Sequence, residues 1–179
     1  MIILGVDPGS IICGYGVIES ESGKLSVLEY GVIKAKKKSE EYPLRLKEIF
    51  ERLQAVIERN IPDETAIESL FFSKNVQSLI KLSQARAIAM LASSIKQIPL
   101  TDYSPREVKK AVTGNGNADK VQVQYMVKKI LNIEETDEFF DSTDALAVAI
   151  CHSARRNFSN SSVKTWKDFI NKNPQRIHK

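Results

Sequence analysis

The sequence predicts an α/β protein with a five-stranded mixed sheet and helices on both faces of that sheet. Short apolar segments with strand alternation come first, and longer segments with helical spacing follow. The predicted order is β-β-β-α-β-α-β-α-α-α, in which the first three strands form an antiparallel meander. The 179 residues, 42% apolar and 27% charged, fit one domain with one core.

The first three strands are separated by short turns. Residues 2–7 are an apolar run that ends at the Pro-Gly-Ser turn of residues 8–10. Residues 14–19 alternate between apolar and polar side chains, Ser22-Gly23 supplies a turn, and residues 25–33 alternate again. These segments therefore predict a three-stranded meander.

Helices and strands then alternate along the chain. Residues 43–60 have helical spacing and end before Pro62, and residues 65–71 form the fourth predicted strand. Residues 75–97 predict a long helix, and residues 98–103 the fifth strand. Three sequential strands followed by this alternation predict a mixed sheet with helices on both faces.

Three helices complete the predicted domain. Ser104 as N-cap, Pro105 in the first turn and Glu107 three residues after the cap are typical of a helix start. Residues 119–131 and 141–156 have helical spacing. The last helix is thus expected to begin at an acidic residue.

The predicted domain covers residues 1–157, and residues 158–179 form a basic tail that is expected to be flexible. The longest uninterrupted apolar run, residues 145–151, is too short to cross a bilayer, and the N-terminus lacks the basic leader of a signal peptide. With Cys13 and Cys151 as its only cysteines, the chain fits a reducing, cytoplasmic location.

Charge is unevenly distributed. Residues 74–129 carry ten Lys and Arg against three acids, and residues 151–179 carry seven against one, whereas residues 133–144 hold six acids and no base. Basic regions around an acidic cluster favour a polyanionic ligand that cations bring up to carboxylates. Charge counts alone fit solvated helix faces at least as well.

Four carboxylates draw attention. Asp7 and Glu68 lie on strand positions where alternation favours apolar side chains, and Asp141 and Asp144 lie one turn apart on the last helix. Each carboxylate also has an ordinary structural explanation. Asp7 could belong to the turn that follows its strand, and Glu68 could form a salt bridge. Asp141 could be the N-cap of the last helix, with Asp144 at its third helical position.

Together, the four carboxylates predict a metal site. If the first and fourth strands are neighbours and the last helix begins at their ends, all four acids meet in one cleft. Such a set suits Mg²⁺ or Mn²⁺, and two ions about 4 Å apart would activate water against a phosphodiester. Zinc is disfavoured because His152 and His178 are the only histidines.

Five motifs also resemble a known family. They are residues 3–10 with 14–18, 67–75, 84–86, 114–120 with 122–123, and 141–147. In this order and spacing they are similar to RuvC-type Holliday junction resolvases, and the resemblance extends from residue 1 to about 157. It implies an RNase H-like fold, a homodimer, and Mg²⁺-dependent paired nicking of four-way DNA junctions in recombination and repair. It also implies a branch-migration motor as partner.

The resemblance assigns roles to individual residues. The family's catalytic, metal-binding acids correspond to Asp7, Glu68, Asp141 and Asp144.

Three further positions correspond to DNA contacts. The family's stacking aromatic corresponds to Phe71, and two DNA-binding basic residues correspond to Lys109 and Lys120. From the sequence alone, Phe71 fits a core position and the lysines fit ordinary surface positions. Cys13 stands where Thr is frequent and Ala87 where Gly is usual, so a role for a hydroxyl at position 13 is in question.

Three other functions remain as alternatives. A phosphate-binding module of the actin and sugar-kinase type shares the opening strand and turn but needs a second domain. A small RNase H-like nuclease acting on RNA is a closer alternative, which RNA substrates would distinguish. A catalytically silent DNA-binding protein would lack one of the acids.

The helix over residues 75–97 is the expected dimer interface, because its few charges leave it without an ordinary solvent face. We expect six of its apolar residues to face the sheet: Val76, Leu79, Ile80, Ala87, Met90 and Leu91. We expect its small residues to admit a second helix: Ser83, Ala85, Ala89, Ala92 and Ser93.

Overall fold

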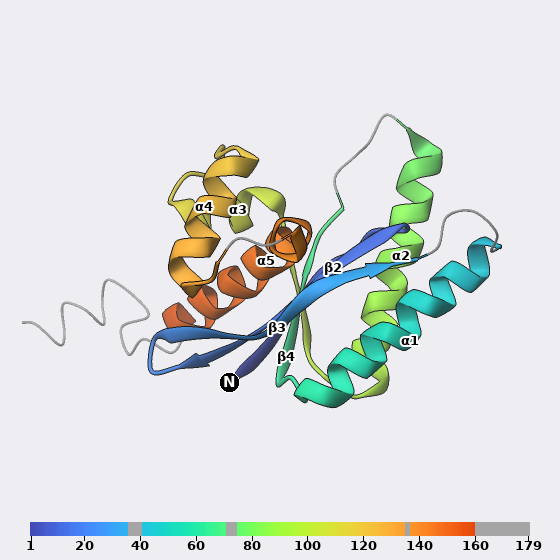
Figure 1. Ribbon diagram of the computed structural model, residues 1–179, viewed down its shortest axis with the longest axis horizontal. Helices are drawn as coiled ribbons and strands as arrows, with labels where there is room; N and C mark the ends of the chain where they lie inside the picture. Colours follow the sequence, from blue (N-terminus) through green and yellow to red (C-terminus); the bar gives the residue numbers. More distant parts are fainter. Residues whose placement is uncertain (36–40, 71–74, 135–136, 160–179) are drawn as a thin grey trace, which may run out of the picture.

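A five-stranded sheet forms the centre of the molecule (Figure 1). The computed structural model describes residues 1–35, 41–70, 75–134 and 137–159, without the side chains of residues 137–141 and 157–159. The strands are β1 (Ile2–Asp7), β2 (Ile12–Glu21), β3 (Lys24–Lys34), β4 (Glu64–Glu68) and β5 (Leu100–Tyr103). The helices are α1 (Tyr42–Asn60), α2 (Val76–Ile95), α3 (Pro105–Thr113), α4 (Lys120–Leu131) and α5 (Asp137–Ser159).

The strand order is β3-β2-β1-β4-β5. β1, β2 and β3 form an antiparallel meander, whereas β4 runs parallel to β1 and to β5. The predicted mixed sheet and element order are confirmed. Because β1 and β4 are parallel neighbours, their carboxyl ends meet at one edge of the sheet.

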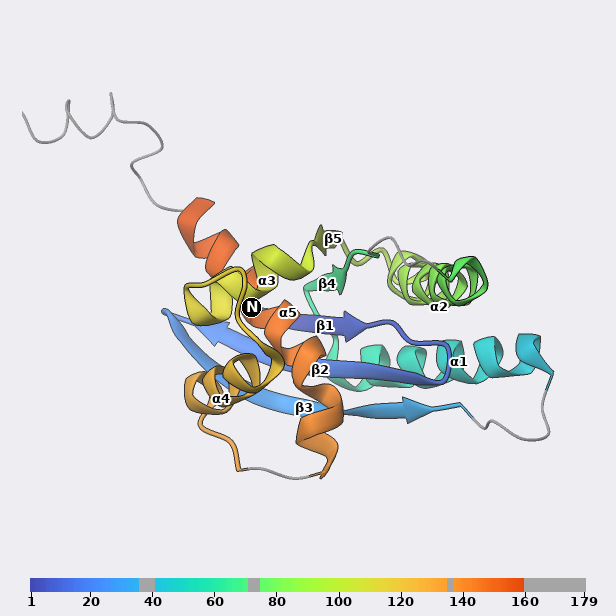
Figure 2. The ribbon, with the colours of Figure 1, turned by 90° about the horizontal axis from the view of Figure 1, so that it is seen from above.

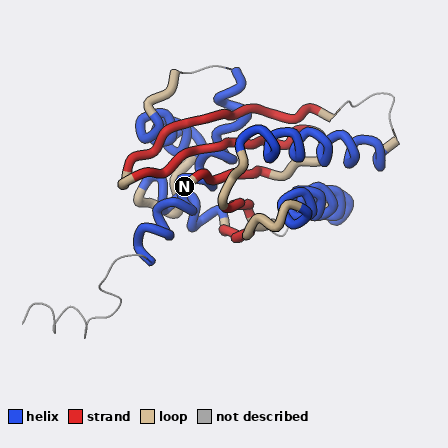
Figure 3. The backbone as a smooth tube through the Cα atoms, turned by 90° about the horizontal axis from the view of Figure 1, so that it is seen from below, coloured by secondary structure: helices blue, strands red, loops and turns tan. Residues whose placement is uncertain are grey.

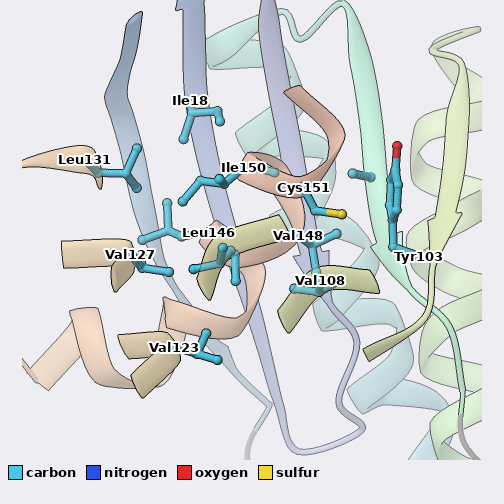
Figure 4. Packing of buried hydrophobic residues seen from close by; sticks show 14 of the residues in the cluster. Ile18, Tyr103, Val108, Val123, Val127, Leu131, Leu146, Val148, Ile150 and Cys151 are labelled. Carbon is cyan, nitrogen blue, oxygen red and sulfur yellow. The ribbon is translucent and has the colours of Figure 1, made fainter. Parts of the chain in front are cut away.

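Helices cover both faces of the sheet (Figures 2 and 3). α1 and α2 pack together on one face, with Leu4, Val17 and Ile67 in the apolar cluster beneath them. α3, α4 and α5 cover the other face, where Leu146 and Val127 lie in a second cluster (Figure 4). The sheet is therefore buried on both sides, as an α/β fold requires.

Local capping signals set two helix starts. Ser104 and Glu107 form the predicted capping box of α3, and Asp119 forms one with Gln122 at α4. α5 differs from the prediction, because it begins at Asp137 instead of residue 141. Asp141 is therefore not an N-cap, and capping does not explain the acid pair that it forms with Asp144.

The expected orientation of α2 is wrong. Four of the five small residues expected on its outer face, Ala85, Ala89, Ala92 and Ser93, are buried in the core instead, and only Ser83 is exposed as expected. Among the larger apolar residues, Val76, Ile80 and Leu91 are exposed, as is Ala87, while Leu79 and Met90 are half-buried. Small side chains let α2 approach α1 and the sheet closely, which leaves an apolar outer face.

No helix in the described part of the chain is long and apolar enough to span a membrane. The predicted tail, residues 158–179, lies outside the described residues from position 160 onward.

Candidate active site

Two carboxylates lie at the carboxyl ends of neighbouring parallel strands. Asp7 is the last residue of β1 and Glu68 the last of β4, and the register pairs the residues just before them, Val6 and Ile67. Since both preceding residues are buried, the strands deliver their terminal carboxylates to the edge of the core.

A third carboxylate reaches the same edge from α5. The helix crosses β1 so closely that a Cβ at Gly5 would collide with the carbonyl oxygen of Ala145. Asp144 directly precedes Ala145 and is half-buried. Asp141 lies one turn earlier on the same helix, but its side chain lies outside the described residues.

The acids border a cavity of about 220 Å³ between the sheet edge, α3, α4 and α5. Glu68 and Asp144 line it together with the two predicted basic residues, Lys109 from α3 and Lys120 from α4. The Lys120 ammonium lies 3.0 Å from a carboxylate oxygen of Asp144. Four residues predicted from distant parts of the sequence thus line one cavity, and Asp7 lies close enough for its charge to interact with those of Glu68 and Asp144.

Mutual repulsion and burial perturb these carboxylates. Burial, followed by the charge of Asp144, raises the pKa of Asp7 to about 6, against a smaller opposing effect of Lys120. Burial and the charges of Asp7 and Asp144 raise the pKa of Glu68 to about 7, although Lys109 and Lys120 oppose this. The two lysines therefore do not fully compensate the negative charge.

Cys13 adjoins this site from β2. Its side chain is fully buried, and burial raises the pKa of the thiol to about 12. A neutral thiol adds no charge beside Asp7, so the ionisation of the site depends on the carboxylates and lysines.

The donor set fits a hard divalent cation. Carboxylate oxygens are the ligands that Mg²⁺ and Mn²⁺ prefer, and the raised pKa values of Asp7 and Glu68 indicate negative charge that a cation would stabilise. Among the described side chains, which omit Asp141, no three acidic, His or Cys groups are close enough to form a complete metal site.

The structure leaves one predicted residue untested and adds one feature that the sequence did not indicate. Phe71, the predicted stacking residue, lies outside the described residues. The wall that Pro105, Val108 and Val123 contribute was missed, because α3 and α4 are distant in sequence from both acid-bearing strands. Their amphipathic spacing indicated buried faces without indicating what those faces would contact.

Comparison with known proteins identifies related chains. The family model described as Crossover junction endodeoxyribonuclease RuvC matches residues 3–152. Relatives with that description from Cytophaga hutchinsonii and Porphyromonas gingivalis are each 43% identical, over 98% of this chain and 88% and 96% of their own.

Solved structures agree with these matches. The structure of Thermus thermophilus RuvC in complex with a Holliday junction substrate matches with a TM-score of 0.83 and 30% identity, over 89% of this chain and 96% of that one. The yeast mitochondrial Holliday junction resolvase matches at a TM-score of 0.66 and 16% identity, over 95% of this chain and 83% of that one, and so shares the fold.

Proposed function

Because the chain belongs to the RuvC family of crossover junction endodeoxyribonucleases, we propose that it resolves four-way DNA junctions by hydrolysing phosphodiester bonds in recombination and repair. The observation that carries the proposal is the meeting of Asp7, Glu68 and Asp144 beside a cavity that also receives Lys109 and Lys120. An RNA nuclease remains the alternative that the experiment below tests.

Asp7, Glu68, Asp141 and Asp144 are the proposed catalytic and metal-binding residues. Two Mg²⁺ ions, with Mn²⁺ as a substitute, would supply an activated water and stabilise the leaving oxygen. The raised pKa values of Asp7 and Glu68 support this role, because burial and neighbouring carboxylates leave negative charge that a cation would stabilise. Protons compete with the cation for these carboxylates, so metal binding should weaken in acid.

Lys109 and Lys120 are proposed to bind phosphates of the substrate. Lys120 lies at the first turn of α4 and contacts Asp144, so it can hold a phosphate beside the acids. Phe71, three residues beyond Glu68, is proposed to stack on a base at the opened centre of the junction.

We also propose that the protein acts as a homodimer in the cytoplasm, together with a branch-migration motor. The exposed apolar face of α2, with Val76, Ile80 and Leu91 about half or more exposed, supports the dimer. A two-fold dimer presents two identical sites to a two-fold junction, which fits paired symmetric nicks.

Cleavage of an end-labelled synthetic four-way junction, followed on a denaturing gel, tests the function. Symmetric nicks are expected with Mg²⁺ and not with EDTA. Glu68→Gln and Asp144→Asn should reduce the rate more than about 100-fold, because metal-assisted charge stabilisation amounts to several kcal/mol. Glu21→Gln, at the exposed end of β2, is the matched control. Two results would contradict the proposal: cleavage of an RNA–DNA hybrid while the four-way junction stays uncut, or normal cleavage rates in both variants.

A further inference from the structure

A second cavity lies on the other side of α3 from the catalytic one. It has a volume of about 400 Å³, and the residues that border it include Tyr103, Glu107, Lys110, Cys151 and Arg155. Figure 4 shows Cys151 pointing toward Tyr103, with Val108 of α3 below them. Basic side chains thus border a cavity that the proposed catalytic reaction does not use.

Helix α3 lies between the two cavities and contributes a basic side chain to each. Lys109 lines the catalytic cavity and its neighbour Lys110 lines the second one, since consecutive residues of a helix point about 100° apart around its axis. Arg106 and Lys110 are four residues apart, and both are exposed, so they lie one above the other on the outer face of α3. Basic groups therefore continue from the catalytic cavity across the helix.

Arg155 and Arg156 extend this basic surface along α5. The Arg155 guanidinium lies over the Tyr103 ring, 5.7 Å from its centroid, and the Tyr103 hydroxyl lies 2.9 Å from Nδ1 of buried His152. Arg156 is hydrogen-bonded to Glu64. Both arginines are exposed but anchored, which reduces the entropy lost when they bind a ligand.

Acidic groups near this surface are already engaged. Glu107 accepts hydrogen bonds from the backbone N–H and the hydroxyl of Ser104 in the capping box. Glu64 contacts both His152, at 2.6 Å, and Arg156. In the described part of the chain, no carboxylate lies within ion-pair distance of Lys110. Glu107 stays negatively charged, because the Ser104 hydrogen bonds and the charge of Arg155 lower its pKa. Glu64 and Glu107 together still carry fewer charges than the four basic groups Arg106, Lys110, Arg155 and Arg156, so the surface keeps an excess of positive charge for a polyanion.

We propose that Arg106, Lys110, Arg155 and Arg156, the flanking basic surface, bind the phosphate backbone of the duplex arm that extends from the catalytic cavity. Asp144 and Arg155 lie eleven residues apart on α5, and at about 1.5 Å per residue this separation is about 16 Å. At about 3.4 Å per nucleotide along one strand, Arg155 contacts a phosphate about five nucleotides from the cut. The inference rests on the proposed junction binding.

Salt-dependent binding tests the charge contribution. The double variant Lys110→Gln/Arg155→Gln should bind a four-way junction on the order of tenfold more weakly at low salt in EDTA. The slope of log affinity against log salt should fall by about 0.9 for each lost phosphate contact, or about 2 in total. Lys47→Gln/Arg52→Gln on α1, across the sheet, removes the same charge and should leave the slope unchanged. Arg155→Lys keeps the charge and should keep most of the slope.

Uncharged methylphosphonate linkages test where along the DNA the flanking basic surface binds. Methylphosphonates placed four to six nucleotides from the cut, on either side, should weaken binding by the wild type but not weaken the double variant further. Either of two results would refute the inference and leave the surface free for a protein partner. The double variant could show the same salt slope as the control pair, or it could keep the full sensitivity of the wild type to methylphosphonates. Failure of the wild type to bind any junction would instead contradict the proposed function. Thermal melting confirms that each variant is folded.

Discussion

Replacing Asp7 with asparagine is expected to stabilise the protein in the absence of metal while abolishing cleavage. The substitution keeps the shape of the side chain and removes one negative charge from a buried cluster. Because burial and Asp144 raise the pKa of Asp7 to about 6, its ionised form destabilises the folded state at neutral pH. The asparagine removes that cost and a proposed metal ligand together.

The pKa shift of Asp7 determines how large the stabilisation by Asp7→Asn is and over which pH range it appears. A pKa raised from 3.8 to about 6 corresponds to about 3 kcal/mol at 1.36 kcal/mol per unit, an upper bound because Asp144 and Glu68 share the repulsion. The folded state binds the proton more tightly than the unfolded chain, so wild-type stability falls as pH rises from about 4 to about 6. The advantage of Asp7→Asn should thus be absent below pH 4 and complete above pH 7, at about 1–3 kcal/mol.

Thermal unfolding in EDTA measures this advantage. For a chain of this length, about 1–3 kcal/mol corresponds to a rise in Tm of roughly 3–10 °C at pH 8. Adding Mg²⁺ should raise the Tm of the wild type and not that of Asp7→Asn, because only the wild type keeps the full ligand set. Glu21→Gln is the control for loss of an exposed charge. A variant that melts below the wild type at pH 8 in EDTA would refute the electrostatic reasoning.

Two further predictions concern DNA binding and assembly. Lys109→Ala and Lys120→Ala should each lower junction affinity and reduce its salt slope by about 0.9, measured by titration from low to high salt; an unchanged slope in both would make them ordinary surface lysines. Ala87→Glu, on the exposed face of α2, should give a folded monomer by sedimentation velocity. Ala89→Glu instead buries a charge in the core and should unfold the protein. A dimeric Ala87→Glu variant would exclude this face as the interface.

The acids at the ends of β1 and β4 could be predicted because they break a pattern. Asp7 shares its strand face with Ile3 and Glu68 shares its strand face with Ala66, and both of these apolar residues are buried. A carboxylate is costly there without a compensating partner, so its presence indicates a site. The sequence period is sufficient for this inference, because alternation along a strand determines which side chains share a face.

The orientation of α2 could not be predicted in the same way. Apolar residues occur all around this helix, so periodicity does not distinguish the core face from an exposed apolar face. Close packing against α1 and the sheet places Ala89 and Ala92 inside, while Ile80 and Leu91 remain outside. Which face of α2 is buried therefore depends on the distance between α2 and its neighbours, and a local sequence pattern does not contain that information.

The start of α5 shows a related difficulty. Asp141 is a good N-cap by residue type, but α5 already begins at Asp137. Acidic residues favour any early helical position through the helix dipole, so several consecutive acids do not specify one start. The earlier start leaves Asp141 and Asp144 inside the helix, where neither caps it.

A core contact determines the electrostatics of the site. Gly5 allows α5 to lie directly on β1, since a Cβ there would collide with the Ala145 carbonyl oxygen and crowd Ala149. Asp144 precedes Ala145 and Asp7 follows Gly5 by two residues, so the same contact determines how close the two carboxylates come. Like charges would otherwise separate, but the buried cluster around Leu146 and Val148 opposes that movement. Burial of apolar surface therefore maintains both the desolvation and the repulsion by Asp144 that raise the pKa of Asp7, and with them the affinity of the site for a cation.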